Sequence, residues 1–277
     1  ADIETTAKSA PLSITGGKRL HGIQYVMPEA SAQVKSCLLL AGMYADGETC
    51  IIEPSHTRDH TERMLTAFSY PLQKCGNKVT INSQHECQAT EIFVPGDISS
   101  AAFFIVAATI IPGSEIIIRN VGINPTRTGI IHILQQMGAK IEMVNKRICG
   151  EELIADILVK HAPLEGIDIP QEWVPLAIDE FPIIFIAAAC AKGQTRVHGA
   201  RELRTKESDR IGAMIAGLTQ LGIHAQGFED GAYIEGGAFS GGEINSYHDH
   251  RIAMAFAVAG SVAKNPITIK NCLNVAT

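Results

Sequence analysis

The chain has 277 residues, of which 46% are hydrophobic and 19% charged, a balance typical of a folded globular protein. Its net charge of −6 gives no general basic surface for nucleic acid or anionic membranes, although a local site for a small anion stays possible. Seven cysteines without a C-x-x-C spacing argue against disulfides or a zinc site and favour a reducing, cytoplasmic compartment. The first residues lack the features of a signal peptide, and no apolar run is long enough to span a bilayer.

An internal repeat organises the chain. Four apolar segments rich in Ala, Ile and Leu are predicted to be helices, and each leads into a β-branched strand. The helices are expected at 31–45, 99–111, 179–191 and 250–263, with Gly47, Gly113 and Gly193 opening the first three strands. In these three copies a second helix follows, and turns at Gly76 and Gly231 predict hairpins after two of them. A Pro-Gly turn at 95–96 predicts a domain break, which divides the chain into 1–95 and 96–277.

The informative polar residues lie at predicted helix starts, where free N–H groups and the helix dipole favour anions. Ser31 opens the first helix, and a simple N-cap is the structural alternative. Arg58 is a cation in a first turn and opposes the dipole, which indicates a bound anion or else a solvated surface side chain. Ser99 and Asn124 are expected to be caps, and Arg127 is expected to be structural or on the surface.

Three further runs abut apolar helices. Lys206 and Arg210 are four residues apart, so we expect them on one helical face with Glu207 beside them. Asp179 precedes another helix and is either a cap or a carboxylate that accepts a proton. The run at 248–251 carries Arg251 and an H-x-H pair without a plausible third ligand, so we expect no metal. If these helix starts converge, the ligand is small and carries more than one negative group.

The motifs resemble those of the 5-enolpyruvylshikimate-3-phosphate synthase (3-phosphoshikimate 1-carboxyvinyltransferase) family. They occur in order along nearly the whole chain at Ser31–Ser36, Pro95–Ala101, Asn124–Gly129, Arg204–Arg210 and Asp249–Met254. The resemblance implies an α/β fold of two similar domains, an inside-out α/β barrel built from repeated βαβαββ units. Residues 1–95 would be what remains of the N-terminal substrate-binding domain, and 96–277 the C-terminal domain.

The resemblance also implies the reaction, in which an enolpyruvyl group moves from phosphoenolpyruvate to the 5-hydroxyl of shikimate 3-phosphate with release of phosphate, in aromatic amino acid biosynthesis. No cofactor, nucleic acid or membrane is implied, and we expect a monomer. Catalytic roles fall on Asp179 as base, Glu207 as proton donor and Lys206. Substrate-binding roles fall on Ser31, Ala32, Gln33, Arg58, Asp179, Lys206, Arg210 and Arg251.

The sequence departs from the family at both ends. A Lys-Ser-x-x-x-Arg run and a Gly-Thr loop that precede the matched region in the family are absent, as is the last strand. We therefore expect a piece of a family member that lacks the N-terminal third and is inactive alone. Two alternatives stay open, the sister transferase that acts on UDP-N-acetylglucosamine and a non-catalytic anion-binding protein. A dehydrogenase is excluded because no G-x-G-x-x-G follows a predicted strand.

Overall fold

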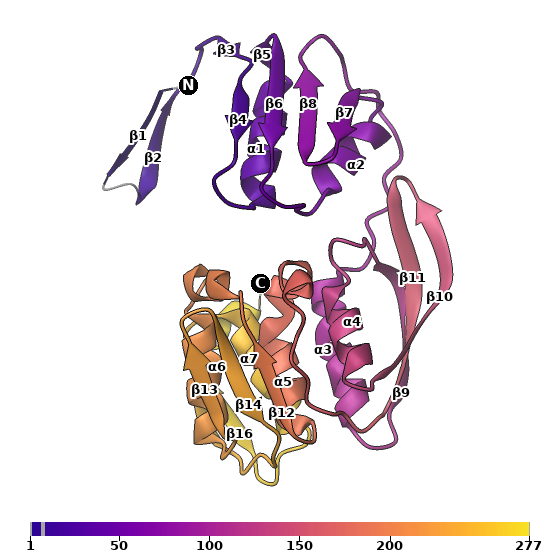
Figure 1. Ribbon diagram of the computed structural model, residues 1–277, viewed down its shortest axis with the longest axis vertical. Coiled ribbons are helices and arrows are strands. Elements are labelled where there is room, and N and C mark those ends of the chain that lie inside the picture. The colour runs from indigo at the N-terminus through magenta and orange to yellow at the C-terminus, as the bar shows by residue number, and fades with distance from the viewer. Residues whose placement is uncertain (1, 7–8, 277) are drawn as a thin grey trace. The chain divides into compact units, whose positions relative to one another are not determined.

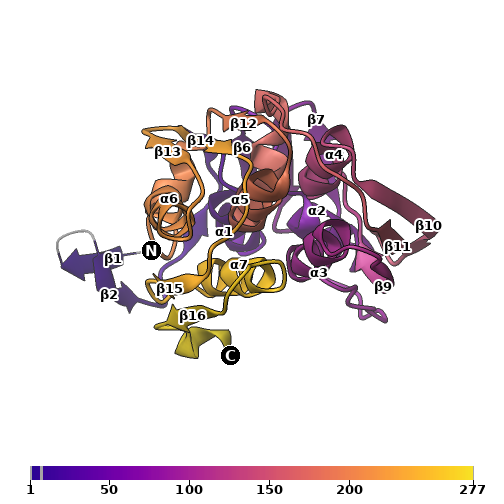
Figure 2. The same ribbon diagram turned by 90° about the horizontal axis from the view of Figure 1, so that it is seen from below.

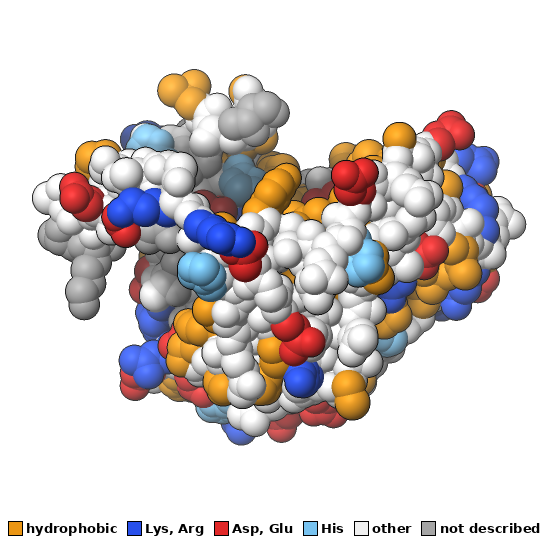
Figure 3. Space-filling view, turned by 90° about the horizontal axis from the view of Figure 1, so that it is seen from above, with side chains coloured by type: hydrophobic (Ala, Val, Ile, Leu, Met, Phe, Trp, Pro, Cys, Tyr) orange, Lys and Arg blue, Asp and Glu red, His pale blue; other side chains and the backbone are white. Residues whose placement is uncertain are grey.

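The computed structural model describes residues 2–6 and 9–276. The chain forms two compact units (Figure 1). Unit 1 holds the residues up to Phe93 together with Gly150–Glu152, and unit 2 holds Val94–Cys149 and the residues from Leu153 onward. Across the described residues, every helix is too short or too polar to cross a membrane. The face drawn in Figure 3 carries Lys and Arg interspersed with Asp and Glu, not one continuous basic area.

Unit 1 contains one four-stranded sheet in the order β4-β6-β8-β7. Its elements are the hairpin β1 (Asp2–Thr6) and β2 (Ser9–Thr15), the short parallel pair β3 (Leu20–His21) and β5 (Ala45–Asp46), β4 (Gln24–Val26), α1 (Ala32–Gly42), β6 (Glu48–Ile52), α2 (His60–Ala67), β7 (Leu72–Cys75) and β8 (Lys78–Asn82). Leu39, Ile51, Leu65, Val79 and Ile81 form the centre of its core.

Unit 2 contains two three-stranded sheets, β10-β11-β9 and β12-β14-β13, and the parallel pair β15-β16. Its helices are α3 (Ile98–Ile110), α4 (Gly129–Gln136), α5 (Phe181–Cys190), α6 (Arg210–Gln220) and α7 (His250–Gly260). Its strands are β9 (Glu115–Gly122), β10 (Lys140–Cys149), β11 (Glu152–Lys160), β12 (Gln194–Val197), β13 (Ala225–Phe228), β14 (Gly231–Glu235), β15 (Gly242–Asn245) and β16 (Ile267–Lys270). Short 3₁₀ segments lie at Gln171–Trp173, Pro175–Glu180, Arg201–Thr205 and Leu273–Val275.

The same βαβαββ unit recurs in both parts of the chain. In unit 1 it runs β4, α1, β6, α2, β7, β8, with β4 parallel to β6. In unit 2 the first strand of two copies is reduced to isolated parallel bridges, Gly96 with Val121 in one copy, and Glu165 with Lys192 and Asp168 with Arg196 in the other. Each hairpin places its second strand beside the strand that follows the first helix. The repeat expected from the sequence is present.

The glycine at each helix-to-strand joint has a backbone reason. Gly47, Gly113 and Gly193 have φ values of +88°, +79° and +88°, a conformation that disfavours a residue with a Cβ atom. Residues after each joint can therefore turn sharply out of the helix and enter the strand. Because a glycine recurs at each helix-to-strand joint, these joints can be recognised in the sequence.

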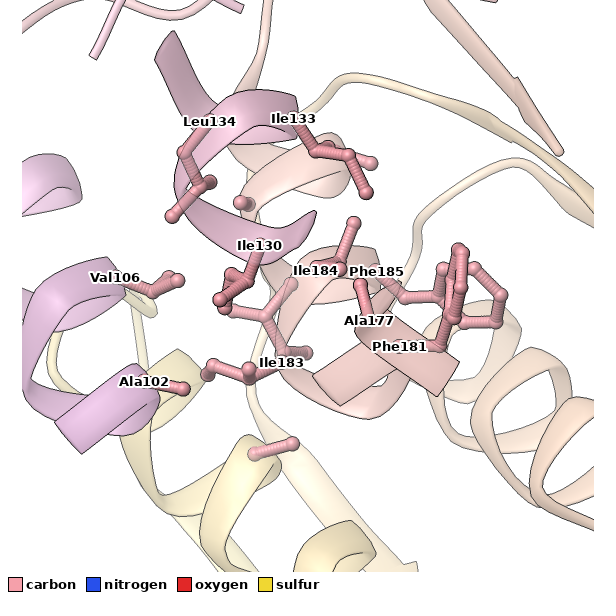
Figure 4. Close-up of a cluster of buried hydrophobic side chains, with 14 of the residues drawn as sticks. Ala102, Val106, Ile130, Ile133, Leu134, Ala177, Phe181, Ile183, Ile184 and Phe185 are labelled. Carbon is pink, nitrogen blue, oxygen red and sulfur yellow. The ribbon is translucent and has the colours of Figure 1, made fainter. Parts of the chain in front are cut away.

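The core of unit 2 centres on α5. Its residues Phe181–Ala189 are all buried, as expected for a helix that is apolar on every side. Figure 4 shows Ile183 and Ile184 among side chains from α3 and α4, and Figure 2 shows α3, α5 and α7 grouped together. A Cβ on Gly217 of α6 would lie 2.3 Å from the Phe256 ring of α7, so this contact requires glycine. This packing around α5 determines the positions of the N-terminal ends of the helices in unit 2.

Candidate active site

Arg210 and Asp249 form the buried centre of a polar cluster in unit 2. The Arg210 side chain is 1% exposed, and its Nε donates to Asp249 Oδ2 at 2.9 Å. Its Nη2 donates to Glu207 Oε2 at 2.6 Å. Its Nη1 is buried and has no hydrogen-bond partner among the described residues. A guanidinium held on two edges with one unused donor suits an anionic ligand.

Asp249 holds Arg210 and also caps α7. Its Oδ1 accepts from the Arg251 N–H at 2.9 Å, and its Oδ2 accepts from the Ser208 hydroxyl at 3.0 Å. Burial alone would raise the pKa of Asp249, but the Arg210 hydrogen bond and charge, Ser208 and the Arg251 N–H outweigh it and lower that pKa. Asp249 therefore stays ionised and locks the start of α7 to the start of α6.

Asp179 brings two cations together. Its Oδ1 lies 3.5 Å from Lys206 Nζ and 3.6 Å from Arg210 Nη1. Lys206 also pairs with Glu202. The Asp179 and Lys206 side chains are 17% and 19% exposed, so both can meet a ligand. A carboxylate beside two cations, partly open to solvent, is a reasonable acceptor for a substrate proton.

The expectation that Lys206 and Arg210 share a helical face is wrong. Asp209 caps α6 by accepting from the Gly212 N–H at 3.0 Å, so the helix begins only at Arg210. Lys206 has an extended backbone and follows the 3₁₀ segment Arg201–Thr205. The two cations meet through Asp179 because the start of α5 lies beside both, and their spacing of four residues plays no part.

Arg251 and Glu180 extend the cluster toward α3. Arg251 Nη1 donates to the Asp179 carbonyl at 3.0 Å and lies 3.7 Å from Glu180 Oε1. Glu180 accepts from the Ser99 hydroxyl and lies 3.9 Å from Arg127 Nη2. Burial raises the pKa of Glu180, while Ser99, Arg127 and Arg251 act in the opposite direction. The starts of α3, α5 and α7 therefore share one polar network.

Two cap assignments made from the sequence need correction. Asp97, not Ser99, caps α3, and its Oδ1 accepts from the Ser99 N–H at 3.0 Å. The Ser99 hydroxyl is thereby available to Glu180 and accepts from Arg127 Nη2 at 2.5 Å. Asn124 Oδ1 accepts from the Thr126 N–H at 2.9 Å, but the N-cap position of α4 is Thr128 and the helix starts at Gly129. The Arg127 side chain is 16% exposed and pairs with Asp97, which agrees with the structural alternative expected for it.

The candidate residues of unit 1 lie at the starts of two helices. Ser31 caps α1, and its hydroxyl accepts from the Val34 N–H at 3.3 Å. Ala32 and Gln33 form the first turn of α1. Arg58 is half-buried and precedes Asp59, the N-cap residue of α2. The cap alternative for Ser31 is therefore real, and a cap can also bind a ligand.

Sequence reasoning missed a buried ion cluster in unit 1. Lys35 Nζ lies 3.2 Å from Glu53 Oε1 and 2.6 Å from Glu62 Oε1, and the Lys35 side chain has no solvent exposure. Thr57 donates to Glu53 Oε1 through its hydroxyl and through its N–H at 3.3 Å. The only hint in the sequence is a lysine within the apolar stretch of α1. The cluster fixes the loop that carries Arg58.

The fold and the cluster in unit 2 together define a class of protein. It is an α/β protein built from repeated units, and the N-terminal ends of its helices carry cations and carboxylates suited to acid–base chemistry on a small anion. Comparison with known proteins makes this specific. The family model of EPSP synthase (3-phosphoshikimate 1-carboxyvinyltransferase) matches residues 1–277. The chain belongs to this family.

Named relatives agree with that assignment. The 3-phosphoshikimate 1-carboxyvinyltransferase of Legionella pneumophila (strain Corby) is 66% identical over 277 residues, and that of Methylococcus capsulatus is 59% identical over 278. The solved EPSP synthase of Acinetobacter baumannii superposes with a TM-score of 0.91 at 55% identity and is matched by the whole chain. In each case the chain spans 64% of the relative's length. The family and fold class expected from the sequence are confirmed.

Proposed function

We propose that the protein transfers the enolpyruvyl group of phosphoenolpyruvate to the 5-hydroxyl of shikimate 3-phosphate and releases phosphate. The observation that carries this proposal is the position of the Asp179 carboxylate, 3.5 Å from Lys206 Nζ and 3.6 Å from Arg210 Nη1. A base is thereby placed beside two cations that can hold anionic groups. The family of the chain, whose relatives are named for this activity, supports the substrate pair.

Two carboxylates exchange protons with the substrates in the proposed chemistry. Glu207, once protonated, gives its proton to the methylene carbon of phosphoenolpyruvate, which leaves a cationic centre at the neighbouring carbon. Asp179 takes the proton of the 5-hydroxyl as its oxygen attacks that centre, forming a tetrahedral intermediate. Phosphate leaves with the proton that Asp179 had taken, while the Glu207 carboxylate takes a proton from the methyl group, which restores the double bond. Arg210 and Arg251 hold phosphoenolpyruvate, and Lys206 holds the phosphate region of shikimate 3-phosphate.

The contacts of Glu207 are compatible with its role. It pairs with Arg210 Nη2 at 2.6 Å while its side chain is 52% exposed. An anion that reaches Arg210 competes with Glu207 for this donor, and the exposed Glu207 side chain can swing away at little cost. Binding of phosphoenolpyruvate would thus release the proton donor at the point where it is needed.

Unit 1 supplies the remaining substrate contacts in the proposal. Ser31, Ala32 and Gln33 at the start of α1 bind shikimate 3-phosphate, and Arg58 binds its shikimate side. Unit 1 corresponds to the substrate-binding N-terminal domain and unit 2 to the C-terminal domain. The proposal needs no metal and no organic cofactor, and it places a monomeric enzyme in the cytoplasm.

Phosphate release tests the proposal directly. The 277-residue chain and the product of its whole reading frame are each mixed with phosphoenolpyruvate and either shikimate 3-phosphate or UDP-N-acetylglucosamine. We expect phosphate release with shikimate 3-phosphate and none with the UDP sugar. If the 277-residue chain and the longer product differ in activity, we expect the longer product to be the active one. Release with the UDP sugar alone would assign the sister reaction. A folded protein that binds both substrates of the proposed reaction without turnover would favour an anion-binding protein.

A further inference from the structure

Glu180 is a buried carboxylate that no step of the proposed chemistry uses. Its side chain is 2% exposed, although it stands at the N-cap position of α5. A carboxylate at this position normally accepts from the N–H groups of its own helix, but Glu180 makes no such cap hydrogen bond. Burying a carboxylate is costly unless it is paired, so its partners on other helices must explain its position.

Those partners form a continuous chain of contacts. Asp97 accepts from Arg127 Nη2 at 3.1 Å, and the same Nη2 donates to Ser99 Oγ at 2.5 Å. The Ser99 hydroxyl donates to Glu180 Oε1, which lies 3.7 Å from Arg251 Nη1. The carboxylate is thus held on the side of α3 and faces Arg251 on the start of α7. This arrangement fixes the negative charge relative to the Arg251 guanidinium.

Arg251 is held on one edge only. Its Nη1 donates to the Asp179 carbonyl at 3.0 Å and is the atom nearest to Glu180. Its Nε and Nη2 make no hydrogen bond within the described part of unit 2, and its side chain is 16% exposed. A planar guanidinium tethered through one nitrogen keeps its other N–H groups ready for a carboxylate or phosphate.

We propose that Glu180 is a positioning residue that, held by Ser99 and Arg127, orients the Arg251 guanidinium for an anionic group of phosphoenolpyruvate. It touches no substrate itself. The binding of phosphoenolpyruvate by Arg251 rests on the proposed function, whereas the orientation of the Arg251 side chain by Glu180 does not. The experiments below separate these two statements.

The first experiment replaces Glu180 by glutamine, which keeps the size and the hydrogen bond to Ser99 but removes the charge. In the active protein, Glu180→Gln should raise the KM for phosphoenolpyruvate about tenfold, because a misplaced guanidinium binds its anion poorly. The KM for shikimate 3-phosphate and the kcat should change by no more than about twofold, as for the control Glu243→Gln on the exposed strand β15. A merely structural role would lower the active fraction and hence kcat, and leave both KM values alone.

A second variant tests the support of Glu180. Ser99→Ala removes the hydroxyl between Arg127 and Glu180 and leaves both charges, so we expect a smaller rise of the KM for phosphoenolpyruvate, about threefold. If Glu180→Gln does not fold, as shown by circular dichroism, Ser99→Ala decides the question. An unchanged KM for phosphoenolpyruvate in the folded variants overturns the proposal.

A third measurement does not depend on turnover. In the 277-residue chain labelled with ¹⁵N-arginine, the Nη groups of Arg251 should rotate slowly, and Glu180→Gln should speed this rotation. Arg251→Lys assigns the signal, and Arg201, which is 77% exposed and pairs with the exposed Glu229, serves as an internal reference for a solvent-exposed guanidinium. If the product of the whole reading frame has no turnover but the rotation in the 277-residue chain responds, the proposed function fails and the orientation by Glu180 stands. If the rotation is the same in both proteins, the positioning role is refuted.

Discussion

Each unit of the molecule contains a cluster of cations and carboxylates, but the two clusters differ in their contact with solvent. In unit 1, the side chains of Lys35, Glu53 and Glu62 are 0%, 1% and 5% exposed. In unit 2, the side chains of Asp179, Lys206, Arg127 and Arg251 are each 16–19% exposed around a fully buried Arg210 and Asp249. The same repeat topology therefore contains one sealed cluster and one open cluster.

This difference in solvent exposure distinguishes charged residues that stabilise the fold from charged residues that a ligand can reach. A sealed cluster has no route to a ligand, and its role is to hold α1, the end of β6 and α2 together. An open cluster with a buried centre can present oriented donors to an anion, since the centre fixes the geometry and the rim meets solvent. Stability should therefore depend most on the cluster of unit 1, and activity most on the rim of the cluster of unit 2.

The largest effect is expected from breaking the sealed cluster. Lys35→Met removes the cation and leaves Glu53 and Glu62 buried without it, which should cost about 3–5 kcal/mol of unfolding free energy. Lys74→Met is the matched control, because Lys74 is 40% exposed, lies 3.8 Å from Asp59 and should change stability by less than about 1 kcal/mol.

The position of the only tryptophan makes this measurement selective. Trp173 lies in unit 2, so tryptophan fluorescence reports on that unit, and amide hydrogen exchange of β6 and β8 reports on unit 1. We expect faster exchange in unit 1 with little change in the fluorescence transition. Equal exchange in wild type and Lys35→Met would show that the cluster is not needed for stability.

The next largest effect should come from the open rim. Arg251→Ala removes a proposed contact to phosphoenolpyruvate and should lower kcat/KM about 100-fold, or about 2.7 kcal/mol of transition-state stabilisation. Arg201→Ala, at a side chain that is 77% exposed, is the control and should leave the rate unchanged. Phosphate release at varied phosphoenolpyruvate measures both. A normal rate for Arg251→Ala would remove this residue from the proposed site.

A pH-dependent effect on stability should come from Asp249, in the buried centre of the unit 2 cluster. The pKa of Asp249 is lowered in the folded protein, so the folded state binds fewer protons there than the unfolded state. This contribution to stability is full above the ordinary carboxyl pKa, about 3.9, and is lost as the pH falls through the lower folded value. Asp249→Asn should thus cost about 2 kcal/mol at pH 7 and progressively less below about pH 4.

Denaturation by urea at several pH values measures this loss in wild type and variant. Asp230 offers a useful comparison, because the Gly199 N–H lowers its pKa as well but its side chain is 44% exposed. Asp230→Asn should therefore show a weaker pH dependence. A difference between wild type and Asp249→Asn that does not change with pH would mean that Asp249 acts only as a cap for α7.

The fold could be predicted from the sequence because local chemistry repeats. The joints at Gly47, Gly113 and Gly193 need a left-handed residue, and each follows an apolar helix, so both signals are visible in one sequence. The hairpins after β7 and β13 were likewise predicted by their Gly turns. Such features depend on neighbours within a few residues, and a periodicity argument captures them.

The site could be predicted only in part because its contacts are not local. Glu180 meets Ser99 across 81 positions of sequence, and Arg210 meets Asp249 across 39, so no spacing rule finds these pairs. The placement of Lys206 failed because a 3₁₀ segment and the Asp209 cap delay the start of α6. Residue types were predicted from helix starts and family motifs, whereas their partners required the packing of α3, α5, α6 and α7.

The smallest effect concerns Ser31, where cap and ligand roles can be separated. Its hydroxyl accepts from Val34 N–H at 3.3 Å, a long bond, so Ser31→Ala should cost only about 0.5–1 kcal/mol of stability in unit 1. Asparagine is as good an N-cap as serine, so Ser31→Asn should keep that stability. If Ser31 also binds shikimate 3-phosphate, both variants should raise the KM for that substrate and leave the KM for phosphoenolpyruvate unchanged. Alanine removes the hydroxyl, and asparagine replaces it by a bulkier amide. A normal KM in Ser31→Asn combined with a raised one in Ser31→Ala would mean that the serine acts only through the helix start, and that the open cluster of unit 2 carries more of the substrate recognition.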